Sequence, residues 1–205
     1  MNEYVGQAIV YVVDDDEAMR DSIRWLLESV NLNGRMFASA NEFLEGADPR
    51  RLGCILLDVR MPGMSGMELL DNLKAHGIFQ PVIIITGHGD VPMAVRALKH
   101  GAFDFIQKPF NGQDLLDRVH AAIKLDHEKH QQHRYKETLR THFEALTPRE
   151  KEIMELVVAG DSSKVIGQKL GISHRTVDIH RGNIMRKLNI ASVAELVQGR
   201  LALQD

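Results

Sequence analysis

Two different spacings of apolar residues occupy the first 125 positions. Short runs rich in Val, Ile and Leu occur at residues 8–13, 53–57 and 82–86, with weaker runs at 34–38 and 102–106. Runs this short and this continuous are typical of strands buried on both faces of a parallel sheet. Between them, apolar residues recur every three or four positions, which predicts helices. Five strand–helix units indicate an α/β fold with a doubly wound, five-stranded parallel sheet.

The helices of this region begin with recognisable signals. Ser39 and Ser65 each precede a glutamate by three positions, Glu42 and Glu68. This spacing predicts a capping box, in which each side chain accepts a hydrogen bond from an otherwise unpaired amide.

The character of the chain changes after residue 125. Residues 126–142 read DHEKHQQHRYKETLRTH, and neither Pro nor Gly occurs from Gln113 to Leu146. Two interpretations remain open for this segment: one long helix, or a solvated and partly frayed connector. We therefore expect a domain at 1–125, a helical linker at 126–145 and a second domain at 146–205.

The second domain shows only helical spacing. Thr147 and Glu150 form a capping box with Pro148 at the first helical position, a complete start signal. Further serine caps predict four helices in all. The second and third are joined by Gly171-Ile172, which fits the tight turn of a helix-turn-helix.

Composition limits the class of protein and the cellular compartment. The chain has 205 residues, 44% apolar and 26% charged, which is ordinary for folded domains. Its single cysteine, Cys54, excludes an internal disulfide, fits a reducing compartment and is expected to be a buried small side chain. The apolar runs are too short to span a membrane, and the N-terminus lacks the basic start of a signal peptide. We expect a cytoplasmic protein.

The net charge of −3 conceals two opposite balances. Residues 1–125 carry 12 basic and 17 acidic side chains, a balance of −5, whereas residues 126–205 carry 13 and 11, a balance of +2. Much of the basic excess falls on the third predicted helix of the second domain, Ser173–Leu188, which alone has a balance of +3. This distribution favours a nucleic-acid contact there.

Polar side chains follow four of the predicted strands: Asp14, Asp15 and Asp16, then Asp58, Thr86 and Lys108. Parallel strands end at one edge of the sheet, so these groups are expected to converge. Clustered carboxylates favour a hard divalent cation such as Mg²⁺, and carboxylate, hydroxyl and ammonium together suit phosphoryl transfer. Taken singly, an aspartate after a strand is usually a turn or cap residue, as we expect for Asp16.

Four segments, VYVVDDDE, CILLDVRMPGMSG, VIIITGHGD and FDFIQKPF, resemble the receiver domain of two-component response regulators over about residues 7–125. The resemblance implies that Asp58 accepts a phosphoryl group from a sensor histidine kinase. It implies a Mg²⁺ site made by Asp15, Asp58 and the carbonyl of Arg60, supported by Asp14. It also implies that Thr86 and Lys108 contact the phosphoryl group.

The same resemblance implies a cis Lys108–Pro109 peptide, a switch in which Thr86 moves and Phe105 turns inward, and a homodimer after phosphorylation. Phe105 also fits an ordinary core position. Phosphatases that use a strand-end aspartate carry a second aspartate two positions later, where this chain has Arg60. We therefore expect a regulator with slow autodephosphorylation rather than an enzyme.

Residues 146–198 resemble the helix-turn-helix domain of the LuxR, FixJ and NarL regulators, through LTPRE, IS-x-x-TV-x-x-H and KLNI. A recognition helix inserts its N-terminal residues into the major groove. The expected DNA contacts are His174, Arg175, Thr176, Asp178, His180, Arg181 and Lys187, with Val177, Ile184 and Leu188 facing the core.

Together these features predict a response regulator that dimerises on phosphorylation, binds promoter DNA and regulates transcription through RNA polymerase, with activation as the expected direction. The alternative is a phosphorelay or scaffold protein whose last domain binds protein. The histidines at 127, 130 and 133 fit a solvated linker face better than a metal site, because no further ligand completes the set.

Overall fold

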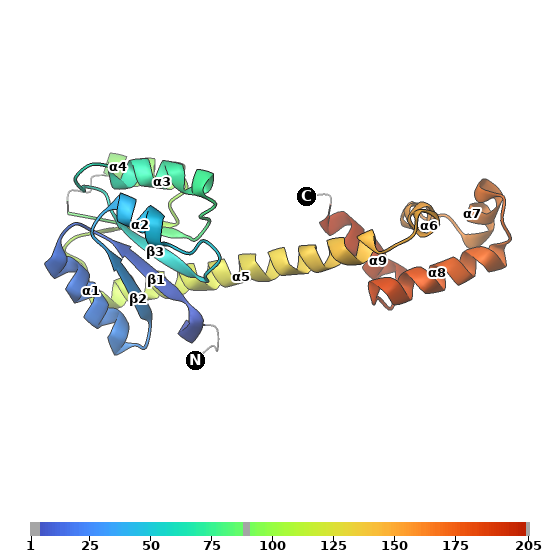
Figure 1. Cartoon of the computed structure of the whole chain (residues 1–205), viewed down its shortest axis with the longest axis horizontal. Helices are drawn as coiled ribbons and strands as arrows, with labels where there is room; N and C mark the ends of the chain where they lie inside the picture. The colour runs from blue at the N-terminus through green and yellow to red at the C-terminus, as the bar shows by residue number, and fades with distance from the viewer. Residues whose placement is uncertain (1–4, 88–90, 204–205) are drawn as a thin grey trace. The chain divides into compact units, whose positions relative to one another are not determined.

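The computed structural model describes residues 5–87 and 91–203, and the chain forms two compact units, residues 1–130 and 131–205 (Figure 1). One long helix, α5 (Gly112–Glu144), contributes residues to both. The interpretation of residues 126–142 as a continuous helix is therefore confirmed. Within the described ranges, no helix combines the length and the hydropathy that crossing a lipid bilayer requires.

The first unit is a five-stranded parallel sheet. Its strands are β1 (Ile9–Val13), β2 (Asn33–Phe37), β3 (Gly53–Asp58), β4 (Val82–Thr86) and β5 (Asp104–Gln107). They lie in the order β2-β1-β3-β4-β5, and each neighbouring pair is parallel. The reversal of strand order beside β1 confirms the doubly wound α/β fold.

Helices cover both faces of this sheet. They are α1 (Glu17–Ser29), α2 (Ala40–Gly46), α3 (Gly66–Asn72), α4 (Val91–Lys99) and the first half of α5, with short 3₁₀ turns η1 (Val5–Gln7) and η2 (Leu73–His76). Side chains of β1 alternate between the two faces. Val10 and Val12 pack with residues of α1 and α5, whereas Tyr11 and Val13 pack with residues of α2, α3 and α4. Both faces are apolar, which explains the continuous apolar runs in the sequence.

A buried carboxylate fixes α5 to the start of β3. Asp126 is 2% exposed, and its Oδ2 accepts a hydrogen bond from the Gly53 amide at 2.9 Å. A Cβ on Gly53 would lie 1.8 Å from the backbone oxygen of Ile9, so only glycine fits there. Burial raises the pKa of Asp126, although the Gly53 amide and the nearby His130 oppose the rise. Cys54, the next residue, is fully buried, as expected.

The predicted helix caps are confirmed in part. Ser65 and Glu68 form a capping box, with the Ser65 amide donating to the Glu68 carboxylate. Ser39 caps α2, but the Glu42 carboxylate accepts from the amide of Ala38 rather than from that of Ser39. The capping box predicted there is wrong in this detail, because the chain enters α2 with the preceding amide closer to the carboxylate.

The second unit contains α6 (Pro148–Val158), α7 (Ser163–Leu170), α8 (His174–Leu188) and α9 (Val193–Ala202). Its core gathers apolar side chains from all four helices, including the predicted Val177, Ile184 and Leu188. A Cβ on Gly167 of α7 would lie 2.7 Å from the backbone oxygen of Ile172. The absence of a side chain at 167 therefore lets the turn between α7 and α8 approach α7 closely.

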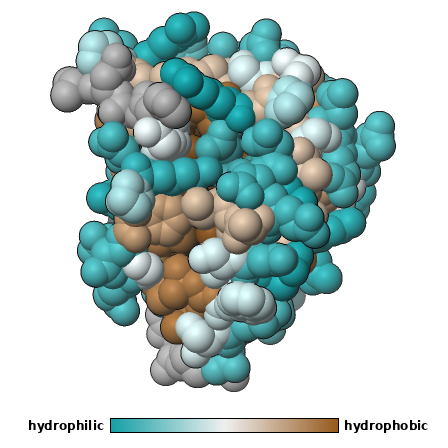
Figure 2. Space-filling model, turned by 90° about the vertical axis from the view of Figure 1, so that its left-hand side faces the viewer, coloured by the Kyte–Doolittle hydropathy of each residue, from teal (hydrophilic) through white to brown (hydrophobic). Residues whose placement is uncertain are grey.

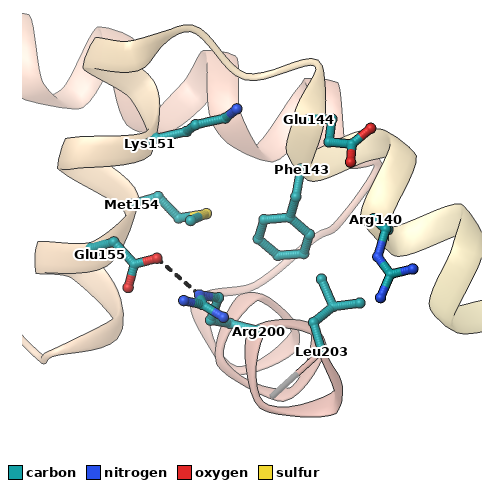
Figure 3. A pocket seen from close by; sticks show the side chains of 8 residues that line it. All are labelled: Arg140, Phe143, Glu144, Lys151, Met154, Glu155, Arg200 and Leu203. Carbon is teal, nitrogen blue, oxygen red and sulfur yellow. Dashed lines mark hydrogen bonds and ion pairs between the residues drawn. The ribbon is translucent and has the colours of Figure 1, made fainter. Parts of the chain in front are cut away.

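The last turns of α5 pack within this second unit. Phe143 points into a hollow of about 220 Å³ beside Met154 of α6 and Leu203, and the Glu155–Arg200 ion pair, 2.9 Å long, closes one side (Figure 3). Leu139, one turn earlier, is 7% exposed. The compact unit therefore begins inside the stretch 126–145 that the sequence suggested as a linker.

Glu150 connects the N-terminal cap of α6 to helix α8 in the second unit. Its carboxylate accepts hydrogen bonds from Lys187 of α8 at 2.7 Å and from the Thr147 amide and hydroxyl. These bonds, that of Lys187 above all, lower the pKa of Glu150 from 4.5 to about 2. We expect Glu150→Gln to lower the free energy of unfolding of this unit by about 0.5–2 kcal/mol at pH 7, the range for loss of a capping side chain.

The stabilisation by Glu150 requires the ionised carboxylate. Because folding lowers the pKa, the contribution is complete above about pH 4.5 and is lost as the pH falls towards 2. Hydrogen exchange of the α6 and α8 amides between pH 7 and pH 3 measures it. Glu152→Gln, on the exposed side of the same helix, is the control. An effect of Glu150→Gln that does not shrink with falling pH contradicts the assignment.

Candidate functional site

The carboxyl edge of the sheet gathers three of the predicted site residues. The Lys108 Nζ lies 2.7 Å from Asp14 Oδ2 and 2.8 Å from Asp58 Oδ1. Asp14 follows β1 and Asp58 ends β3, and these strands are neighbours in the sheet. Both carboxylates are buried, 2% and 6% exposed. The topology thus brings together groups that are 94 positions apart in the chain.

Burial and charge act against each other at these groups. Burial raises the pKa of Asp14, although the Lys108 ammonium and the Asp16 amide lower it in part. Burial alone would lower the pKa of Lys108, but hydrogen bonds to Asp14 and Asp58 outweigh it, and the pKa is raised. Lys108 therefore remains charged at neutral pH and compensates two carboxylates at once.

Backbone groups complete the pocket. The Asp16 amide donates to Asp14 Oδ1 at 2.9 Å, and the Arg60 amide donates to Asp58 Oδ2 at 2.6 Å. Asp16 itself caps α1, as predicted. Arg20 of α1, which the sequence did not single out, donates from Nη1 to the backbone oxygen of Asp14 at 2.7 Å. A basic residue one turn into a helix is too common a feature to have revealed this contact.

The expected set of metal ligands is gathered only in part. Asp15 is exposed, and within residues 5–87 and 91–203 no three His, Cys, Asp or Glu side chains are grouped so as to hold a metal ion. The assignment of Asp14, Asp15, Asp58 and the Arg60 carbonyl to a Mg²⁺ site therefore stays a prediction, and in this structure Lys108 joins Asp14 to Asp58. Two buried carboxylates beside a third nevertheless supply the hard oxygen donors that Mg²⁺ prefers.

Glycine at 66 brings α3 against the backbone of Asp58. A Cβ at this position would lie 2.0 Å from the backbone oxygen of Asp58. The Gly66 amide also donates to the backbone oxygen of Val59 at 3.0 Å. The first turn of α3 therefore supports the end of β3 directly, and the position of the Asp58 carboxylate depends on it.

The residues of the expected switch lie at the ends of β4 and in β5. Thr86 is 1% exposed, and its backbone oxygen accepts a hydrogen bond from the Lys108 amide at 2.8 Å. Phe105 is half-buried and packs against the core under α4. The Lys108–Pro109 peptide is cis, as expected. Residues 88–90 of the TGHGD motif lie outside the described residues.

The second candidate site is the surface of α8. Ser173 caps this helix by accepting from the Thr176 amide. His174 and Arg175 are exposed in its first turn, and Ile179 is 59% exposed one turn later. A large apolar side chain in solvent beside basic residues suits a groove that presents both phosphates and thymine methyl groups.

Other predicted DNA contacts of α8 also bind within the domain. Ser163 of α7 donates to Asp178 at 2.6 Å and accepts from Arg181 at 3.2 Å. Lys187 pairs with Glu150 of α6. His180 is half-buried. These contacts hold α8 against α6 and α7. The position of its exposed N-terminal end relative to the rest of the domain is therefore fixed.

Exposed apolar side chains are present on the first unit as well. Figure 2 shows a face on which apolar side chains gather in a patch within a largely hydrophilic surface. The exposed large apolar residues described in this unit include Trp25 of α1, which is 70% exposed, and Val95 and Leu98 of α4. Contiguous apolar surface often marks a contact with another protein.

Comparison with known proteins agrees with this architecture. Residues 10–120 match the family described as the response regulator receiver domain, and residues 144–199 match the bacterial regulatory proteins of the luxR family. Two curated relatives are each 44% identical. The alignment with Nodulation protein W of Bradyrhizobium diazoefficiens covers 94% of this chain and 85% of that protein. The alignment with the transcriptional regulatory protein FixJ of Azorhizobium caulinodans covers 95% of this chain and 91% of that protein.

Among solved structures, that of the response regulator StyR superposes with a TM-score of 0.84 at 44% identity, covering 95% of this chain and 98% of that one. A receiver domain joined to a LuxR-type DNA-binding domain defines a two-component response regulator that acts in transcription. More narrowly, the chain belongs to the FixJ/NarL family of these regulators.

The close approach of Gly66 to Asp58 is testable. Gly66→Ala places a methyl group where only 2.0 Å is available, so α3 or the end of β3 has to move. We expect a loss of about 1–3 kcal/mol in the unfolding free energy of the receiver, as for an overpacked core, measured by hydrogen exchange of the β1 and β3 amides. In Gly6→Ala the added methyl group meets nothing within 4 Å, and no loss is expected. Equal stability of the two variants contradicts the packing argument.

Proposed function

We propose that Asp58 is the phosphoryl acceptor of this regulator. An oxygen of the Asp58 carboxylate attacks the phosphorus of a phosphohistidine on a sensor histidine kinase. The P–N bond breaks, and the imidazole leaves with the electron pair. The observation that supports this assignment is that Asp58 shares the Lys108 ammonium with Asp14 in a buried pocket at the carboxyl edge of the sheet.

We propose Mg²⁺ as the partner cation, held by the carboxylates of Asp14, Asp15 and Asp58 and the carbonyl of Arg60. When bound, it would neutralise charge on the oxygens of the transferred group. Lys108 supplies a second positive charge and can pass from the Asp58 carboxylate to an oxygen of the new phosphoryl group. Water can later attack the same phosphorus; the P–O bond to Asp58 then breaks, inorganic phosphate leaves and the carboxylate is regenerated, which is the proposed slow autodephosphorylation.

The proposed response involves Thr86 and Phe105. A phosphoryl group adds acceptor oxygens that the Thr86 hydroxyl can reach when its loop moves inward. That movement opens space for Phe105, which is only half-buried. The surface of α4 and β5 then changes and supports a homodimer. The exposed Val95 and Leu98 of α4 supply apolar surface for such a contact.

The proposed output is promoter binding by α8. Arg175 and His174 lie at the exposed N-terminal turn. In the proposed complex, Arg175 contacts a guanine or a phosphate, and Ile179 makes an apolar contact with a thymine methyl group. Thr176, Asp178, His180 and Arg181 lie on the same helix and complete the proposed surface. Lys187 also belongs to the proposed surface, and without DNA it binds Glu150. Activation would follow from contact with RNA polymerase at the promoter.

The phosphoryl acceptor can be tested on the full chain with Mg²⁺ and acetyl phosphate. We expect the wild type to gain the mass of one phosphoryl group and to shift towards a dimer, and Asp58→Asn to do neither. Intact-protein mass and light scattering measure both results. Asp71→Asn removes an exposed carboxylate of α3 and should behave as the wild type. Phosphorylation of Asp58→Asn at the wild-type level contradicts the assignment.

The DNA interface can be tested with a duplex selected from a random library by the phosphorylated protein. We expect affinity to fall steeply with salt, because phosphate contacts release counterions. Arg175→Ala should cost about 1–3 kcal/mol of binding if Arg175 contacts a base, or reduce the salt slope by about one if it contacts a phosphate.

The matched control for Arg175→Ala is Arg140→Ala, which removes an exposed arginine of α5 that pairs with Glu137. It should leave both affinity and slope unchanged. The alternative function, a scaffold whose last domain binds protein, predicts no salt-dependent affinity for any selected duplex. That result would overturn the assignment of α8 as a DNA-reading helix.

A further inference from the structure

A pocket lies at the opposite edge of the sheet from Asp58. We define the distal pocket as the cavity of about 490 Å³ lined by residues of α3, η2, the start of β4, the segment before β5, and α5. Val82 begins β4 and Phe103 precedes β5. Because all strands are parallel, these residues lie at the amino edge, away from the carboxyl edge that holds the acceptor. Its volume is within the range of small-molecule sites.

The walls of the distal pocket are apolar. Leu70 and Leu73 form buried parts of the lining, and Phe103 and Leu125 are half-buried. Phe79 stands at the pocket with 65% of its surface exposed. An aromatic ring left in water beside a cavity is covered when an apolar molecule enters, which favours binding.

A buried glutamine, Gln80, forms part of the wall of the distal pocket. Gln80 is 5% exposed, and its Nε2 donates to the backbone oxygens of Arg51 at 2.9 Å and Asp48 at 3.3 Å. These two acceptors fix which end of the amide carries nitrogen. Within the described residues, the remaining atom, the Gln80 Oε1, is buried and has no hydrogen-bond partner. The two hydrogen bonds to backbone oxygens hold the Gln80 side chain in one position in the wall of the pocket.

The charged side chains of the lining are basic. Lys74 of η2 and Lys129 of α5 are both exposed. The lining also includes His100, whose ring pairs with Asp71 at 2.6 Å. Lys129 is attracted to Asp126, but that buried carboxylate already accepts the Gly53 amide. The lining itself contains no carboxylate among the described residues, so an anionic group is favoured there.

We propose that the distal pocket binds a small amphipathic anion, with an apolar, preferably aromatic, body against the apolar lining and one acidic group near Lys74 and Lys129. The site is separate from Asp58 and does not depend on phosphorylation. Leu125 and Lys129 belong to α5 beyond the last strand, so an occupant would hold this part of the helix against the first unit.

The test uses 8-anilinonaphthalene-1-sulfonate, which carries an aromatic body and a sulfonate, on the full chain without a phosphodonor. N-phenyl-1-naphthylamine, which lacks the sulfonate, is the matched probe. We expect the sulfonate probe to bind more tightly and to shift the amide resonances of Phe79, Gln80, Phe103 and Leu125. Equal affinity of the two probes, or shifts confined to other surfaces, would overturn the proposal.

Variants separate the lysines of the pocket from general surface charge. Lys74→Ala with Lys129→Ala should weaken binding of the sulfonate probe about tenfold, the effect of losing one charge-assisted hydrogen bond, and leave the uncharged probe unchanged. Lys99→Ala with Lys124→Ala removes two exposed lysines that do not line the pocket and should change neither. If both pairs of substitutions weaken the sulfonate probe equally, the attraction is non-specific and the proposed site is wrong.

Discussion

The ammonium of Lys108 between the carboxylates of Asp14 and Asp58 is the contact on which the receiver depends. Two buried carboxylates repel each other, and burial raises the pKa of Asp14. A single cation that bonds to both, at 2.7 and 2.8 Å, lets them remain side by side. The contact exists only because three parallel strands end at one edge. The places of β1, β3 and β5 in the sheet therefore determine this contact as well as the core.

The same geometry explains why the two edges of the sheet differ. At the carboxyl edge, acidic side chains and amides point towards a common centre, and Gly66 lets α3 approach the backbone of Asp58. At the amino edge, apolar residues and basic side chains surround a cavity. The sheet between them has apolar side chains on both faces. The two ends of one domain can thus present opposite charge without conflict.

Much of the fold was predictable from residue spacing, because both faces of a parallel sheet and one face of each helix must be apolar. The ends of the strands were less predictable. The apolar run 102–106 suggested a strand from residue 102, but β5 begins at Asp104, and Phe103 packs at the margin of the sheet. Asp58 and Lys108 were predictable because strand ends converge. Arg20, Asp126 and Gln80 were not, because their partners depend on the path of the backbone. Likewise, no pattern could show that Lys187 would bind Glu150.

The pair formed by Asp126 and Gly53 has a consequence for the evolution of this family. Residues 53 and 126 lie 73 positions apart and are joined by one hydrogen bond, from the Gly53 amide to the Asp126 carboxylate. Position 53 has no room for any side chain. A substitution at 126 leaves that amide buried without an acceptor, whereas a substitution at 53 collides with Ile9. Relatives that keep this contact should therefore have glycine at 53 and a hydrogen-bond acceptor at 126, whatever residues surround the Asp58 carboxylate.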